Sequence, residues 1–183
     1  RANNRYHAAE PLGESGIPGG LWFMNTGKTL EDADLQVLLE RHEIFRLNSM
    51  LFVSGGLAGL LAELDLGRGG LHRVPVYMQD GTTEFRRDVF LLEFPNAKDT
   101  VNRDATPRCK PLYPNRPDTT FKLPMSLAGR DVFVKSDAVG PPDLWFDPMI
   151  DQTQFASDAA AQRLIAEGHD VSFDLNQCKL LDP

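Results

Sequence analysis

The amino-acid sequence predicts an α+β fold, with a mixed or mainly antiparallel sheet and helices packed on it. Short apolar runs at 50–54, 85–95 and 130–136 carry the β-branched and aromatic residues that favour strands. Segments with helical spacing, bounded by Ser or Thr at the start and by Gly at the end, lie between such runs. One order of helix and strand occurs twice, so we expect two similar helix-strand units.

Length and composition favour one soluble domain over residues 1–183. The chain has 183 residues, of which 42% are hydrophobic and 25% are charged, and its formal net charge is -7. No apolar run approaches the roughly 18 residues that a membrane span requires, so no membrane partner is expected. The negative charge argues against nucleic-acid binding, which needs clustered Lys and Arg side chains.

The cysteines and histidines form no metal-binding motif. Cys109 and Cys178 lie far apart in the sequence, which favours reduced thiols and a cytoplasmic location. The histidines occur singly, without the spacing of paired metal ligands, and are His7, His42, His72 and His169. We therefore expect neither a metal nor any other cofactor.

The N-terminal region is expected to hold a loose arm, a strand and a helix. Residues 1–20 are rich in Asn, Gly and Pro, which predicts a loosely ordered N-terminal arm. A short strand is expected at 21–25, and Thr29 is placed to cap a helix with acids in its first turn. Among these acids, Asp32 and Asp34 are candidate partner-binding residues, because an acidic patch would speed association with a basic partner.

The next segment reads as strand, helix and two further strands. Ser54 follows the strand 50–54 and is predicted to cap a helix over 55–63. A strand is expected at 71–80. The strand at 85–95 has apolar residues on both faces, as expected for a central strand that is covered on both sides.

A proline-rich loop is predicted at 106–124. Proline removes a backbone donor and fixes φ, so closely spaced prolines exclude a long helix or an interior strand. Long loops in compact domains often bind something, and Tyr113 and Arg116 are the residue types that anchor interfaces, with Arg108 and Lys110 also within reach. The prolines of this loop are Pro107, Pro111, Pro114, Pro117 and Pro124.

The repeated arrangement covers 52–78 and 155–181. Each copy has a Phe, a small residue, a Ser at the expected N-cap, a helix ending in Leu/Ile-Ala-Glu, a Gly-containing stop and an alternating strand. The helices are expected to pack on the sheet through one apolar face, made by Leu57, Leu60, Leu61 and Leu64 in the first copy and by Ala161, Leu164 and Ile165 in the second.

Two aspartates, one in the second copy and one just before it, have structural interpretations. Asp158 is expected in the first helical turn, where a carboxylate meets free N–H groups and the positive end of the helix dipole. Gly168 follows the helix and suits the left-handed cap conformation. Asp147 and Pro148 form a common turn pair in which the aspartate accepts hydrogen bonds from nearby N–H groups.

The same residues carry a resemblance to a known family. The order Pro-Pro-Asp-Leu-Trp-Phe-Asp-Pro at 141–148, then Phe-Ala-Ser-Asp at 155–158, a short helix and Gly-His-Asp-Val-Ser-Phe-Asp before a terminal strand resembles the C-terminal half of the bacterial Imm11 (DUF1629) immunity proteins. The resemblance covers 132–181 and extends to 47–94, where Val-Pro-Val at 74–76 fits a strand that follows the earlier helix.

The resemblance implies a single immunity-type domain in the bacterial cytoplasm. Such a protein binds and neutralises a cognate toxin that is encoded beside it, by stoichiometric occlusion and without catalysis; a nuclease is one candidate toxin, because such toxins are often basic. No particular oligomeric state is implied. The motif residues would be scaffold, and they are Trp145, Asp147, Pro148, Ser157 and Asp158.

Two other functions stay open at this point. A metal-dependent hydrolase would use the acids around Asp147, namely Asp143, Asp147, Asp151 and Asp158, although their spacing crosses a strand, a turn and a helix start. A non-catalytic regulatory module would bind another protein through the proline-rich loop. The glycine-rich segment at 54–59 precedes a helix but lacks the Lys and the spacing of a phosphate-binding loop.

Overall fold

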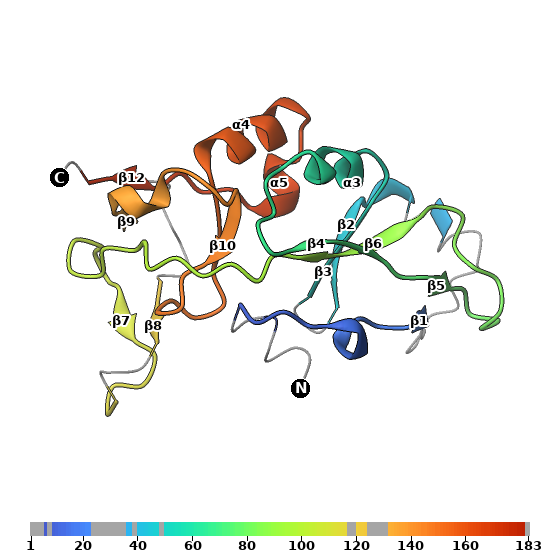
Figure 1. Cartoon of the computed structure of the whole chain (residues 1–183), viewed down its shortest axis with the longest axis horizontal. Coiled ribbons are helices and arrows are strands. Elements are labelled where there is room, and N and C mark those ends of the chain that lie inside the picture. The colour runs from blue at the N-terminus through green and yellow to red at the C-terminus, as the bar shows by residue number, and fades with distance from the viewer. Residues whose placement is uncertain are drawn as a thin grey trace. The chain divides into compact units, whose positions relative to one another are not determined.

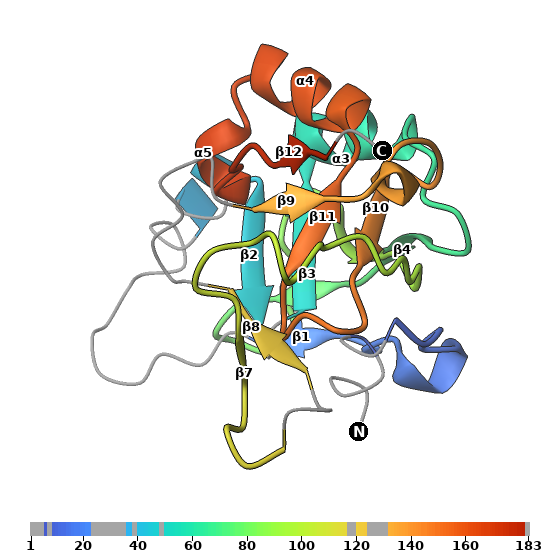
Figure 2. The same ribbon diagram turned by 90° about the vertical axis from the view of Figure 1, so that its left-hand side faces the viewer.

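The computed structural model describes Tyr6 and residues 9–22, 36–37, 40–47, 50–116, 120–123 and 132–181. The chain divides into two compact units, shown as ribbons in Figures 1 and 2. Unit 1 is Arg1–Tyr6, Pro11–Leu64 and Gly69–Glu93, and unit 2 is His7–Glu10, Asp65–Arg68 and Phe94–Pro183. Both contain helices and antiparallel strand pairs, so the predicted α+β class is confirmed. Since one cooperative domain can contain several compact units, a single domain over 1–183 stays a prediction.

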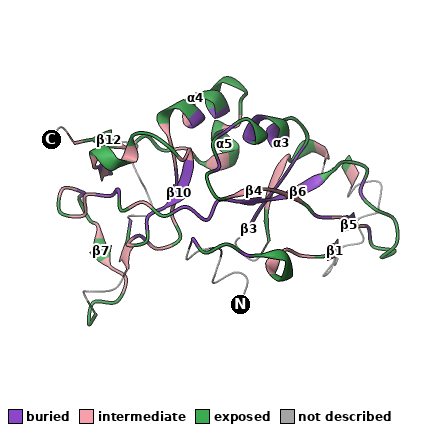
Figure 3. Ribbon diagram, viewed as in Figure 1, coloured by how far each residue is buried: buried purple, intermediate pink, exposed green. Residues whose placement is uncertain are grey.

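Unit 1 is built on a four-stranded antiparallel sheet. Its strands lie in the order β2 (Ile44–Leu47), β3 (Met50–Ser54), β6 (Val89–Glu93) and β4 (Gly70–Arg73). The predicted central position of the strand within 85–95 is confirmed, because β6 lies between β3 and β4 and most of its residues are buried (Figure 3).

Helix α3 (Gly55–Ala62) packs through the apolar face that the sequence predicted. Leu57, Leu60 and Leu61 of the helix and Leu64 just after it are all buried. Burial of a leucine side chain contributes roughly 1.5–3 kcal/mol, so this face is enough to hold a helix this short. The helix predicted over 55–63 is thereby confirmed.

The cap of α3 differs from the prediction. Ser54 occupies the N-cap position, but its side chain makes no capping hydrogen bond. Instead, the Glu43 carboxylate accepts hydrogen bonds from the backbone N–H groups of Gly56 and Leu57, each at 3.0 Å. Gly55 has a φ of 59°, in the left-handed region that favours glycine, and a Cβ at this position would displace the Glu43 carboxylate.

Glu43→Ala is expected to lower the free energy of unfolding by about 1–2 kcal/mol, because two helix N–H groups lose their acceptor. Ser54→Ala serves as the control and should cost less, since the Ser54 hydroxyl does not cap the helix. Urea unfolding followed by circular dichroism measures both changes. An equal or larger loss in Ser54→Ala would show that the serine, rather than the glutamate, stabilises the helix start.

The described part of the N-terminal segment has buried anchor points on β6. The Tyr6 hydroxyl donates to the Leu92 carbonyl at 2.8 Å, and the Leu12 N–H donates to the Glu93 carboxylate at 2.6 Å. Both Tyr6 and Leu12 are buried, and burial raises the pKa of Tyr6 above its ordinary value. The predicted loose arm over 1–20 is therefore fixed to the sheet at these two residues, and it also contains the short helix η1 (Glu14–Gly16).

The strand predicted at 21–25 is confirmed at its start, and the strand predicted at 71–80 is interrupted. β1 (Leu21–Trp22) pairs in parallel with β5 (Val76–Tyr77), and residues 23–25 lie outside the described residues. Within 71–80, β4 ends at Arg73 and β5 starts at Val76. Pro75 separates the two strands because it has no N–H to donate to a ladder.

The described part of unit 2 contains three two-stranded sheets, two α-helices and connecting segments. β7 (Lys110–Pro111) and β8 (Phe121–Lys122) pair antiparallel, as do β10 (Leu144–Phe146) and β11 (Gln154–Ala156), whereas β9 (Phe133–Val134) and β12 (Lys179–Leu180) pair in parallel. The helices are α4 (Asp158–Ala166) and α5 (Asp170–Phe173), with the short η2 (Ser136–Ala138). A buried cluster joins these elements: Val101, Leu123, Val132, Val134, Trp145, Ile150 and Phe155.

The second copy of the repeat is confirmed as far as its helix and corrected beyond it. Gly168 ends α4 with a φ of 77°, and its N–H donates to the Ile165 carbonyl at 3.0 Å. The alternating segment after it was expected to be a strand, but 170–173 forms α5, and Val171 is 86% exposed. The strand of this copy, β12, comes later, at Lys179–Leu180.

The buried face of α4 also differs from the prediction. Leu164 is fully buried, as expected, but Ile165 is 48% exposed. Ala160 is buried and Ala161 only half-buried, because positions 160 and 164 are four residues apart and share one face of the helix. Among the helices that the structure describes, none is long and apolar enough to cross a membrane.

Candidate functional site

The motif around Asp147 lies in unit 2, at the end of β10. Trp145 pairs with Phe155 across β10 and β11, and the chain then turns at Asp147 and Pro148, closed by a hydrogen bond of 3.0 Å from the Ile150 N–H to the Asp147 carbonyl. On the other side of β10, Phe146 exchanges backbone hydrogen bonds with Asn96 and Lys98. This pairing places the segment that follows Lys98 beside the Asp147 side chain.

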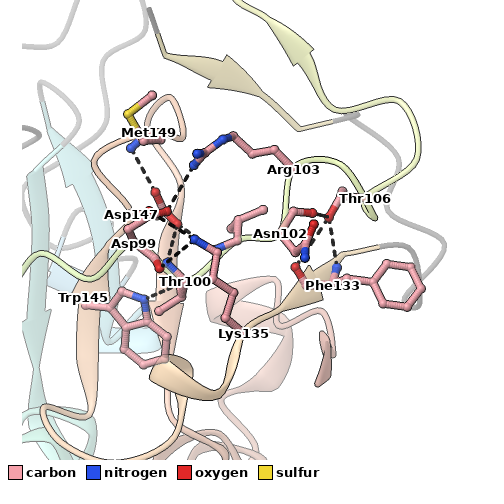
Figure 4. A network of polar contacts seen from close by, with 11 residues as sticks. Asp99, Thr100, Asn102, Arg103, Thr106, Phe133, Lys135, Trp145, Asp147 and Met149 are labelled. Carbon is pink, nitrogen blue, oxygen red and sulfur yellow. Dashed lines mark hydrogen bonds and ion pairs between the residues drawn. The ribbon is translucent and has the colours of Figure 1, made fainter. Parts of the chain in front are cut away.

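The Asp147 carboxylate is used inside the fold. One oxygen accepts from the Thr100 and Val101 N–H groups, each at 2.8 Å, and the other accepts from the Met149 N–H at 2.9 Å (Figure 4). The side chain is only 1% exposed. Three backbone donors on a buried carboxylate join two segments that are far apart in sequence, so Asp147 has the structural role that the turn interpretation predicted.

Trp145 is a second buried residue of the motif. Its indole N–H donates to the Thr100 hydroxyl at 3.1 Å, and its ring stacks on Phe155 with 5.9 Å between centroids. The Lys98 ammonium group lies 4.2 Å from the indole centroid and donates to the Gly140 carbonyl at 2.9 Å. Desolvation lowers the pKa of Lys98, and the nearby Asp137 and Asp143 carboxylates oppose this effect.

A charged cluster borders the Asp147 network. The Asp99 carboxylate accepts from Lys135 and Arg103, both at 3.1 Å (Figure 4). Desolvation acts to raise the pKa of Asp99, but the hydrogen bonds and charges of these two cations outweigh it and lower the pKa. These ion pairs are partly exposed, so each contributes little to stability.

Ser157 and Asp158 start helix α4 as predicted. The Ser157 hydroxyl accepts from the Ala160 N–H at 3.1 Å and donates to the Asp143 carboxylate at 2.5 Å. The other Asp143 oxygen accepts from the Asp65 N–H at 2.9 Å. Asp158 is exposed in the first turn of the helix, and Pro148 is exposed in the turn after Asp147.

Two of the four acids of the hydrolase hypothesis are engaged by the protein itself. Asp143 and Asp147 accept hydrogen bonds from backbone and serine donors, as described above. Among the described residues, no three or more His, Cys, Asp or Glu side chains form a group that could hold a metal ion. His72 contacts the Glu93 carboxylate at 2.6 Å in unit 1. Burial raises the pKa of both Cys109 and Cys178, which lie beside the buried cluster of unit 2.

The predicted partner-binding residues have different outcomes. Tyr113 is 58% exposed, Arg116 is also exposed, and the Arg116 N–H donates to the Tyr113 carbonyl at 2.9 Å, so one turn holds both. Asp32 and Asp34 lie outside the described residues. The β7–β8 hairpin within 106–124 was not predicted, because two-residue strands with a proline give no alternation signal.

Comparisons of the chain with protein-family models, with curated proteins and with solved structures gave no match. The resemblance of 132–181 to immunity proteins therefore stays a prediction from the motif. The placement of the motif residues within the fold is the observation on which a functional argument rests.

Proposed function

We propose that the chain is a bacterial immunity protein of the Imm11 type, which acts in the cytoplasm by binding a cognate toxin and occluding its active site. The observation that carries this proposal is the structural use of three of the five motif residues. Asp147 accepts three backbone N–H groups, Trp145 is buried, and Ser157 caps α4. Residues with these roles stabilise the fold, as the resemblance implies, so other, exposed residues would contact the toxin.

The turn at Tyr113 and Arg116 is the recognition surface of this proposal. Both residue types bury large contact areas at interfaces, and the prolines on either side reduce the conformational entropy that binding would remove. Asp32 and Asp34 together with the net charge of -7 would speed association with a basic toxin, and a nuclease is one such partner.

Co-expression tests the proposal directly. The protein is produced with the toxin encoded beside it, and host growth and a one-to-one complex are measured. Tyr113→Ala and Arg116→Ala are each expected to weaken the complex by about 1–2 kcal/mol, or roughly tenfold. Val139→Ala removes an exposed apolar residue, 69% exposed, outside the hairpin and should leave affinity unchanged. Absence of both complex and protection would contradict the proposal.

The exposed turn also fits a regulatory protein-binding module, which stays the second candidate. The two candidates differ in the growth readout. A regulatory module would bind its own partner protein, and Tyr113→Ala would weaken that complex. It would give no protection against the toxin. The hydrolase candidate has less support, because the oxygens of Asp147 already accept backbone hydrogen bonds.

A further inference from the structure

The hairpin of β7 and β8 carries two lysines directly opposite each other. In the antiparallel register, Lys110 pairs with Lys122 and Pro111 pairs with Phe121. Directly opposite residues of an antiparallel pair point to the same face, and neighbouring residues along each strand point to opposite faces. Lys110 and Lys122 therefore share one face of the hairpin, which we call the lysine face.

The opposite face of the hairpin is the one attached to unit 2. Phe121 packs against the buried cluster of unit 2, and its backbone exchanges hydrogen bonds of 2.7 and 2.8 Å with Met149 and Asp151. Lys110 and Lys122 are both exposed. In the two views of the ribbon, the described part of the hairpin projects from the remainder of unit 2 (Figures 1 and 2).

Two like charges in direct opposition destabilise a strand pair unless an anion lies between them. Throughout the described part of the chain, neither ammonium group lies within ion-pair distance of a carboxylate, although Asp151 is joined to Phe121 through the backbone. Among the described residues, this pair of cations on a proline-rich hairpin thus has no neutralising carboxylate. A bound anion would remove the repulsion between them.

The charge of this segment is opposite to that of the chain. Residues 107–123 contain four cations, Arg108, Lys110, Arg116 and Lys122, and one acid, Asp118, which gives 4 - 1 = +3 against -7 for the whole chain. Such a local reversal attracts a negatively charged group to this hairpin while the surrounding protein repels extended polyanions.

We propose that the lysine face binds an acidic segment of a partner protein through carboxylates placed between Lys110 and Lys122. This inference goes beyond the proposed function, because it assigns the chemistry of the partner at this hairpin whether or not that partner is a toxin. Recognition is through side chains, since Pro111 lacks the N–H that an added strand would need on β7.

A nucleic acid fits this face less well than an acidic protein segment. Single-stranded binding sites combine a long basic groove with several aromatic stacking platforms. Tyr113 is exposed near the lysine face, but Phe121 is turned into the buried cluster. The net charge of -7 would also repel a phosphate backbone beyond the hairpin itself.

Fluorescence anisotropy with a short labelled peptide, in which about two glutamates are flanked by neutral residues, tests the inference at low ionic strength, where surface charges are least screened. The full chain is compared with Lys110→Gln/Lys122→Gln, with the charge-conserving Lys110→Arg/Lys122→Arg, and with Arg86→Glu. Arg86 is exposed on unit 1, so Arg86→Glu matches the double Gln variant in net charge but lies outside the hairpin. Thermal unfolding confirms that every variant is folded.

The double Gln variant is expected to bind the peptide about fivefold more weakly than the parent, because two exposed ion pairs are lost. Lys110→Arg/Lys122→Arg should bind the peptide as tightly as the parent does. Equal weakening by Arg86→Glu would overturn the proposal, because net charge alone would then explain binding. Tighter binding of a single-stranded oligonucleotide of the same charge would assign the face to nucleic acid instead. Failure of the full chain to bind the peptide at all would also overturn the proposal about the lysine face. The proposed immunity function would not be affected by this result, because toxin protection is measured separately.

Discussion

Asp147→Asn is expected to lower the free energy of unfolding by about 3 kcal/mol. The Asp147 carboxylate offers only acceptors to the N–H groups of Thr100, Val101 and Met149. An amide must place its NH₂ group against at least one of these donors, in either orientation, and the charge that strengthens the remaining hydrogen bonds is lost. Hydrogen bonds to charged groups contribute about 1.5–3 kcal/mol, and an unsatisfied buried donor costs about 1–3 kcal/mol.

Asp158→Asn provides the matched control for this prediction. The same chemical change is made eleven positions later in the chain, on an exposed carboxylate in the first turn of α4. It should cost about 0.5 kcal/mol, since only the interaction with the helix dipole weakens. Urea unfolding at constant pH gives both values, and unchanged m-values would show that the unfolded states are comparable. Equal effects of the two substitutions would remove the structural role assigned to Asp147.

The sequence predicted that Asp147 would accept backbone hydrogen bonds, but it did not predict which residues would donate them. An Asp-Pro pair predicts a turn, and a turn aspartate commonly accepts nearby N–H groups, as Met149 donates here. The donors Thr100 and Val101 come from a segment that is remote in sequence, and no local pattern indicates that it lies beside β10. Because these hydrogen bonds join segments that are remote in sequence, the motif could be identified from the sequence but its hydrogen-bond partners could not.

The two helix starts show how far local capping rules extend. Ser157 caps α4 through the Ala160 N–H, as the sequence predicted. Ser54 occupies the same position before α3, but Glu43 supplies the acceptors from outside the helix. A capping serine is one solution among several, and a distant carboxylate can replace it when the chain brings it to the free N–H groups.

Three short strands of unit 2 were the least predictable elements. β7, β8 and β12 are two residues long, too short for alternation to be distinguished from chance, whereas β9 lies within the strand predicted at 130–136. The proline-rich loop was correctly placed as a turn-containing surface segment, yet the register that sets Lys110 opposite Lys122 depends on pairing across the loop. The burial of these strands and the register between β7 and β8 therefore could be obtained only from the structure.

Leu164→Ala is expected to lower the free energy of unfolding by about 3 kcal/mol, whereas Ile165→Ala should change it by less than about 0.5 kcal/mol. The two residues are adjacent on α4 and lose similar volume, but Leu164 is fully buried and Ile165 is 48% exposed. Removing the Leu164 side chain leaves a cavity under the helix, and removing Ile165 leaves none. The sequence predicted that both would pack on the sheet, so the comparison separates the observed face from the predicted one. Similar losses in urea unfolding would favour the predicted face, because an exposed isoleucine has too few contacts to cost several kcal/mol.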